Sequence, residues 1–148
     1  MTRIVLFGLA CLLFAVATFV SWYQGSNLVD SPSDWLYTAI FSKWLHDGPL
    51  ESSNISQLDF FVYSIKYHPV FPILMMVSFV YIFIASSARW FKKSLTWIVA
   101  FLMGLLIIGG ISIASSPTDG GRLMMLSMFG VAILLMVYII GFRNKAIS

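Results

Sequence analysis

Four stretches of the chain are long and apolar enough to cross a lipid bilayer, and they constrain the fold more than any other feature. About 20 apolar residues span the roughly 30 Å of hydrocarbon in a bilayer. The four stretches are residues 4–22, 70–88, 95–114 and 123–142, and none contains Asp, Glu, Lys, Arg or His. Only 10% of the 148 residues are charged, against about 25% in soluble domains. The sequence therefore predicts an all-α membrane protein with four transmembrane helices, and a single membrane domain over residues 1–148.

The first stretch has the features of a retained span, with a cleaved signal peptide as the alternative. Its apolar run is longer than the 7–15 residues usual in signal peptides. Trp22 and Tyr23 follow it, where a cleavage site needs small residues. We therefore expect residues 4–22 to remain in the membrane.

The distribution of Lys and Arg predicts the orientation, because loops on the cytoplasmic side carry the excess of basic residues. Six basic residues fall on one side of four spans, and only Lys43, Lys66 and Arg122 fall on the other. The six are Arg3, Arg89, Lys92, Lys93, Arg143 and Lys145. Both termini are thus predicted to be cytoplasmic. All six acidic residues then lie outside, where the formal charge is 3 − 6 = −3.

Residues 23–68 form a long outer segment, and a structureless loop of this length is uncommon. Its first half predicts a helix over residues 32–46. Ser31 is a candidate cap and Pro32 suits the first helical position, while Asp34 complements the helix dipole. Gly48 and Pro49 end the helical pattern.

This predicted helix is amphipathic. Its apolar face consists of Leu36, Tyr37, Ile40, Phe41, Trp44 and Leu45, and its polar face consists of Thr38, Ala39, Ser42 and Lys43. A helix too short to span, with such a face, suits the membrane interface. We expect Leu36, Ile40 and Trp44 to face the bilayer or the end of the helix bundle and the polar face to be wet. A partner's groove is the remaining alternative for the apolar face.

The second half of the outer segment predicts another amphipathic helix, over residues 55–67. Ile55, Leu58, Val62 and Ile65 recur at helical spacing. Ser53 or Asn54 is the expected cap. His68 and Pro69 end this helix before the second span.

Small residues predict where the transmembrane helices pack closely. Gly110 and Ala114 form one small-xxx-small pair in the third span, and Ser112 and Ser116 form another. Such pairs allow close approach of two helices, within the bundle or across a homodimer interface. Cys11 and Ala15 form a weaker pair in the first span.

Two stretches resemble a known family. "SWYQGSNLVDSPSDWLYTAIF" (residues 21–41) and "QLDFFVYSIKYHPVFP" (residues 57–72) are similar to the YjdJ-like family of small, uncharacterised integral membrane proteins of Bacillus-type bacteria. The resemblance runs from the first span through the second. It implies a bacterial plasma membrane, and it implies no catalytic residue, substrate or cofactor.

The outer segment offers one weak constellation for a metal site, because imidazole and carboxylate groups bind divalent metals. Its members are His46, Asp47, Asp59 and His68. Their spacing matches no compact metal motif, and His46 and Asp47 are adjacent, so on a helix they point in different directions. The preferred interpretation is that these are solvated surface residues, with no metal, cofactor or catalytic group.

These features predict a non-enzymatic accessory or interaction protein of the bacterial cell envelope. Its expected partners are the lipid bilayer and a second copy or an unidentified membrane protein, and nucleic acid is not expected. A small oligomeric channel or transporter is one alternative, although coupled carriers usually have ionisable residues within the membrane. A membrane enzyme with a site at the outer interface is the other.

Overall fold

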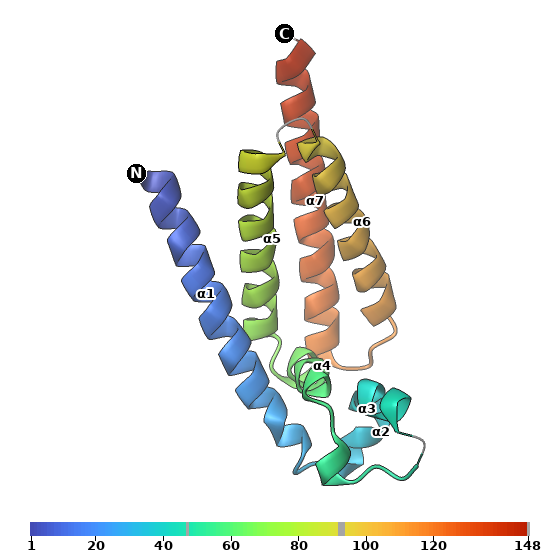
Figure 1. The fold of residues 1–148 in the computed structure, drawn as a ribbon. Coiled ribbons are helices and arrows are strands. Elements are labelled where there is room, and N and C mark those ends of the chain that lie inside the picture. The colour runs from blue at the N-terminus through green and yellow to red at the C-terminus, as the bar shows by residue number, and fades with distance from the viewer. Residues whose placement is uncertain (47, 92–93, 148) are drawn as a thin grey trace.

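Four long helices dominate the computed structural model, which describes residues 1–46, 48–91 and 94–147, with the backbone alone described from residue 142. They are α1 (Thr2–Gly25), α5 (Val70–Trp90), α6 (Leu95–Ile113) and α7 (Asp119–Ile147). Each is long and apolar enough to cross a membrane. The prediction of an all-α membrane protein with four spans is confirmed, although α1, α5 and α7 extend beyond the predicted limits and α6 ends one residue earlier. Figure 1 shows the outer segment at the end of the bundle opposite the N- and C-termini.

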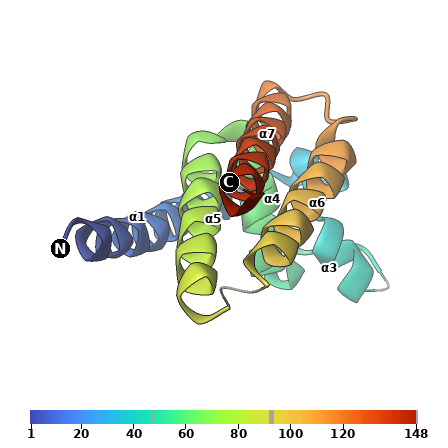
Figure 2. The same ribbon diagram turned by 90° about the horizontal axis from the view of Figure 1, so that it is seen from above.

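The apolar core lies between α5, α6 and α7. Met76 and Val80 of α5 pack with Val99 and Leu102 of α6 and with Leu135 of α7. Helices α6 and α7 form a tight antiparallel pair, and the view from above places α7 beside both α5 and α6 (Figure 2). Each of these five side chains is at most 9% exposed.

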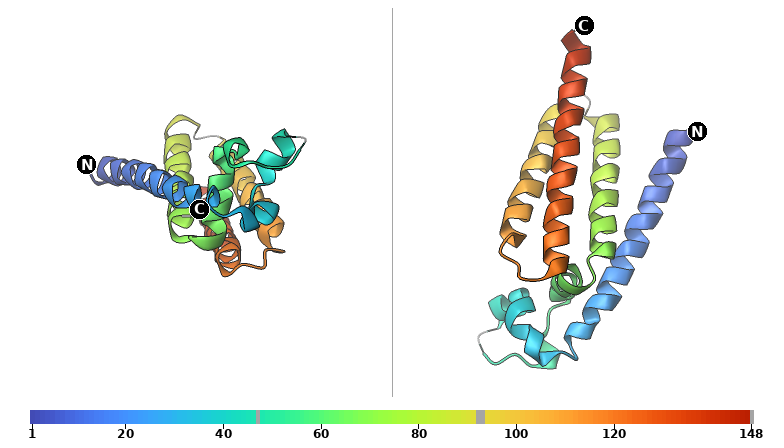
Figure 3. Two further views of the ribbon diagram at one scale, coloured as in Figure 1. Left: turned by 90° about the horizontal axis from the view of Figure 1, so that it is seen from below. Right: turned by 180° about the vertical axis from the view of Figure 1, so that it is seen from behind.

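Helix α1 packs against α5 outside this core. Its buried residues are Ala17, Ser21 and Gly25, which recur every four residues and therefore lie on one face. Cys11 and Ala15 are exposed, so the small pair predicted for this helix lies away from the packed face. Towards its N-terminus α1 diverges from α5, as Figure 3 shows from behind.

Helix α4 (Gln57–Tyr67) lies across the outer end of the bundle and packs against α1, α5 and α7. Two glycines allow these crossings. A Cβ atom at Gly25 would overlap the carbonyl group of Phe60, and a Cβ atom at Gly120 would overlap the carbonyl oxygen of Lys66. Backbone therefore meets backbone where α1 ends and where α7 begins.

The start of α4 differs from the prediction. Ser53 and Asn54 belong to a separate 3₁₀ turn (Ser52–Asn54), and the hydroxyl of Ser56 accepts a hydrogen bond from the amide of Leu58 at 3.3 Å. Ser56 is thus the cap, and the helix begins two residues later than predicted. It ends at Tyr67, and α5 begins directly after the predicted His68-Pro69 interruption.

Gly25→Ala should destabilise the protein, because the added methyl group has no space against the backbone of α4. We expect a loss of roughly 1–3 kcal/mol, the usual cost of overpacking, seen as a lower melting temperature of the detergent-solubilised protein. Gly8→Ala is the matched control in the same helix, since a Cβ atom there meets nothing within 4 Å. Equal melting temperatures for the two variants would contradict the close crossing of α1 and α4.

Candidate functional site

The outer segment folds into short helical pieces beneath the bundle (Figure 3). Besides α4 and the turn at Ser52–Asn54 they are the 3₁₀ turns Ser26–Leu28 and Pro32–Asp34 and the helices α2 (Trp35–Thr38) and α3 (Ile40–Leu45). The single helix predicted over residues 32–46 is wrong, because the backbone breaks at Ala39, with φ −81° and ψ 58°. Pro32 does open the helical turn, but Ser31 makes no side-chain cap.

The break at Ala39 is explained by Asp59 of α4. The carboxylate of Asp59 accepts hydrogen bonds from the amides of Phe41 and Ser42, both at 2.8 Å, and from the hydroxyl of Ser42 at 2.5 Å. These amides belong to the first turn of α3, where no helical carbonyl is available to them. A carboxylate at this position also complements the positive end of the helix dipole.

Two lysines donate hydrogen bonds to carbonyl groups that precede the break. A continuous helix would bond the amides of residues 40 and 41 to the carbonyls of Leu36 and Tyr37. Instead, the ammonium group of Lys43 donates to the carbonyl of Leu36 at 2.5 Å, and that of Lys66 donates to the carbonyl of Tyr37. Two carbonyl groups that the break releases therefore accept hydrogen bonds from side chains.

The lysine on α4 lies beside an acidic group. Burial lowers the pKa of Lys66 below its ordinary 10.5, and the nearby carboxylate of Asp34 opposes this shift. The hydroxyl of Tyr67 donates to the same carboxylate at 3.2 Å. These contacts join the 3₁₀ turn Pro32–Asp34, which precedes α2, to the end of α4.

The hydroxyl of Ser42 links α3 to the start of α4. It donates to Asp59 and accepts from the amide of Ser56 at 2.7 Å. Both Ser42 and Asp59 are fully buried. A buried charge is costly unless hydrogen bonds satisfy it, and here three donors surround one carboxylate.

This arrangement places most of the polar face inside the protein. Thr38, Ala39 and Ser42 are at most 1% exposed, whereas Leu36 is 64% and Trp44 88% exposed. The expectation of a wet polar face is wrong for these three residues, because their small side chains allow α2 and α3 to approach α4. The apolar face points away from the protein, and no residue that the structure describes covers it. Contact of Leu36, Ile40 and Trp44 with the bilayer or with a partner's groove stays a prediction.

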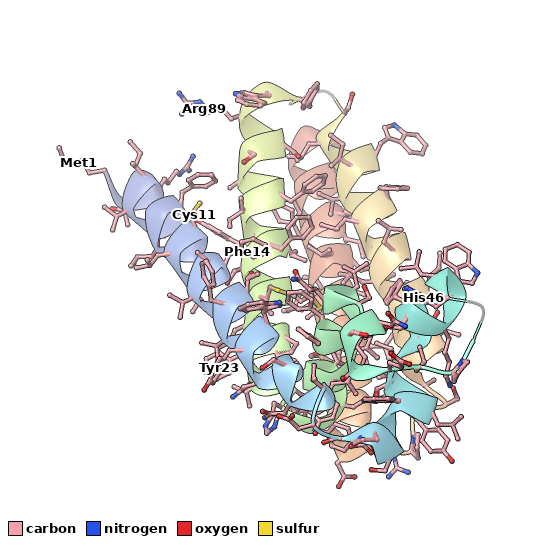
Figure 4. The ribbon with its side chains drawn as sticks, turned by 60° about the horizontal axis from the view of Figure 1, so that its bottom comes forward. Met1, Cys11, Phe14, Tyr23, His46 and Arg89 are labelled. Carbon is pink, nitrogen blue, oxygen red and sulfur yellow. The ribbon has the colours of Figure 1, made fainter. Side chains whose placement is uncertain are left out.

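The candidate metal ligands do not come together among the residues that the structure describes. His46 and His68 are exposed, and Figure 4 shows His46 at the far end of α3. Asp59 is buried and bonded to α3. No group of three or more His, Cys, Asp and Glu side chains occurs in the described ranges, and Asp47 lies outside them.

The small residues of the third span lie in different surroundings. Gly110 is buried, and a Cβ atom there would lie 3.1 Å from the ring of Phe129 in α7. Ser112 and Ala114 are exposed, while Ser116 is half-buried at the turn before α7. Gly110 therefore lies in the close contact between α6 and α7.

Sequence reasoning missed the residues that organise this region, Ser42 and Asp59 above all. The pair is separated by 17 positions, so no local pattern reveals it. The spacing of Ala17, Ser21 and Gly25 was a readable signal for close helix packing.

Replacing Asp59 tests the site. Asp59→Ala leaves the amides of Phe41 and Ser42 without their partner, which should cost on the order of 3 kcal/mol and lower the melting temperature. Limited proteolysis should then cut near Ala39. Asp30→Ala is the control, because Asp30 is an exposed carboxylate of the same segment. Unchanged stability and unchanged proteolysis in Asp59→Ala would contradict the capping role.

Comparison with known proteins identifies the family. The model of a domain of unknown function, DUF4306, matches residues 4–91. An uncharacterised protein of Bacillus subtilis (strain 168), YjdJ, is 45% identical over 84 residues, which cover 55% of this chain and 77% of that protein. No solved structure matches. The matched region contains α1, the outer segment and α5, and it ends before α6. The chain therefore belongs to the DUF4306 family, whose function is unknown.

Proposed function

We propose that this chain is a non-enzymatic interaction protein of the bacterial plasma membrane, and that the apolar face of α2 and α3 binds another membrane protein. One observation supports the proposal above all. Six large apolar side chains are exposed on two short helices that hydrogen bonds from α4 hold in place. Soluble surfaces usually avoid apolar patches of several hundred Å², and a patch of this kind marks an interaction site.

The charge of the outer surface favours a protein partner over a lipid surface. Helices that lie on membranes usually have Lys and Arg along their polar face. Here the outer surface has a formal charge of −3, and the ammonium group of Lys43 is bonded to the backbone. Anionic headgroups would repel this surface, whereas an apolar groove of a partner would accept Leu36, Ile40 and Trp44.

The proposal includes an orientation, with both termini in the cytoplasm and the outer segment on the outer side of the plasma membrane. Its support is the six-to-three distribution of Lys and Arg along the chain. The presence of a relative in Bacillus subtilis supports a bacterial plasma membrane. The partner is then accessible from outside the cell.

Thiol-directed photocrosslinking on intact cells tests orientation and partner together. A membrane-impermeant crosslinker is attached to Leu45→Cys, next to Trp44, in a background with Cys11→Ser. We expect the thiol to react without permeabilisation, and illumination to give one discrete adduct with a membrane protein, which mass spectrometry identifies. Ile40→Asp in the same chain should abolish the adduct, because a charge on the apolar face opposes docking.

Ser53→Cys is the matched control. Ser53 is exposed in the same outer segment but belongs to the turn before α4, so it should react and give no discrete adduct. Reaction only after permeabilisation would contradict the orientation. An adduct with lipid alone, or one that survives Ile40→Asp, would contradict the protein partner.

A further inference from the structure

A cleft lies between α1 and α5 at the end of the bundle that carries the N-terminus. Its volume is about 790 Å³, within the range of about 300–1,000 Å³ for small-molecule sites. Phe7 of α1 and Tyr81 and Ala85 of α5 line it, and Arg3 and Arg89 contribute their side chains at its end. The lining is thus mainly apolar, with two guanidinium groups where both helices leave the membrane.

Among the residues that the structure describes, no acidic side chain lies at the end of the bundle that carries Arg3 and Arg89. The described acidic residues belong to the outer segment and to the first turn of α7, at the opposite end of the bundle (Figure 1). Arg3 and Arg89 are exposed, and Figure 4 shows the Arg89 side chain extending from α5 on the side where α1 lies. A ligand of the cleft therefore meets two positive charges that no described acidic side chain neutralises.

The cleft is open towards the surrounding lipid. It lies where α1 diverges from α5, and Ile4, at the edge of the cleft, is 75% exposed. The neighbouring Trp90 is 77% exposed, and tryptophan is enriched at the level of the lipid headgroups. In a bilayer spanned by these helices, the apolar part of the cleft would lie beside acyl chains and the guanidinium groups beside phosphates.

We propose that this cleft binds one anionic phospholipid. The lipid phosphate accepts hydrogen bonds from the guanidinium groups of Arg3 and Arg89, and an acyl chain lies between Phe7 and Tyr81. Arginine forms strong, charge-assisted bonds with phosphate, and basic pockets between transmembrane helices bind anionic headgroups.

A second copy of this chain fits the cleft less well than a lipid. A copy inserted in the same orientation brings its own Arg3 and Arg89 to the same depth, and so adds like charge. An anionic phospholipid supplies both the missing negative charge and the apolar chain. The inference is independent of the partner proposed for the outer segment.

Thermal unfolding of the full-length protein in a neutral detergent tests this site. Phosphatidylglycerol is titrated against the wild type and against a double variant, Arg3→Gln with Arg89→Gln. Wild type should be stabilised saturably by phosphatidylglycerol, but not by phosphatidylcholine with the same acyl chains or by inorganic phosphate. The double variant should bind phosphatidylglycerol at least about tenfold more weakly, which corresponds to a loss of about 1.4 kcal/mol or more of binding free energy.

Two further variants separate the cleft from nonspecific charge effects. Ala85→Phe fills the cleft and retains both arginines, so it should also lose the stabilisation. Arg122→Gln removes a basic residue at the other end of the bundle and should retain it. Equal stabilisation of the double variant, or a full effect in Ala85→Phe, would overturn the proposal. Stabilisation by inorganic phosphate alone would assign the site to a free anion, and a dimer that Ala85→Phe dissociates would assign it to a second copy.

Discussion

The structure of the outer segment depends on the buried carboxylate of Asp59. A six-residue helix such as α3 is too short to be stable alone in water, and its first amides have no backbone partners. The carboxylate of Asp59, on α4, accepts hydrogen bonds from two of these amides. The hydroxyl of Ser42 donates a further hydrogen bond to the same carboxylate. The position of α3, and with it the direction of the apolar face, follows from this contact.

Helix α4 connects α2 and α3 to the membrane helices, because it packs against both. The same helix carries Asp59 towards α3, receives Gly25 of α1 on one side and contacts Gly120 of α7 on another. The rings of Trp22 and Phe60, whose centroids lie 6.4 Å apart, add an aromatic contact between α1 and α4. The outer segment is therefore attached to both helix pairs, α1 with α5 and α6 with α7, and it presents its apolar face from a fixed position. The proposed partner would meet a surface that is already ordered, which lowers the entropic cost of binding.

The sequence predicts the four spans well, because continuous apolar runs of about 20 residues have one main explanation. It also predicts which side chains of residues 32–46 are apolar and that α4 is a helix. It does not reveal the break at Ala39 or the burial of Thr38 and Ser42, since both depend on tertiary contacts with α4. A helical wheel assigns small polar residues to water by default, and here their small size matters more than their polarity, because it permits close packing on α4. From the sequence alone Asp59 is a candidate metal ligand, because the sequence does not reveal which group binds its carboxylate. In the structure that carboxylate is bound by α3.

Hydrogen exchange of the wild-type protein, measured by mass spectrometry in a membrane mimic, tests the central claim most directly. If Asp59 caps α3 in the folded state, the amides of Phe41 and Ser42 should exchange far more slowly than those of an unstructured peptide. Their protection should be similar to that of α4, because one set of contacts holds both helices. Exchange of these two amides at the unstructured rate, with α4 still protected, would show that Asp59 does not hold α3 and would contradict the account.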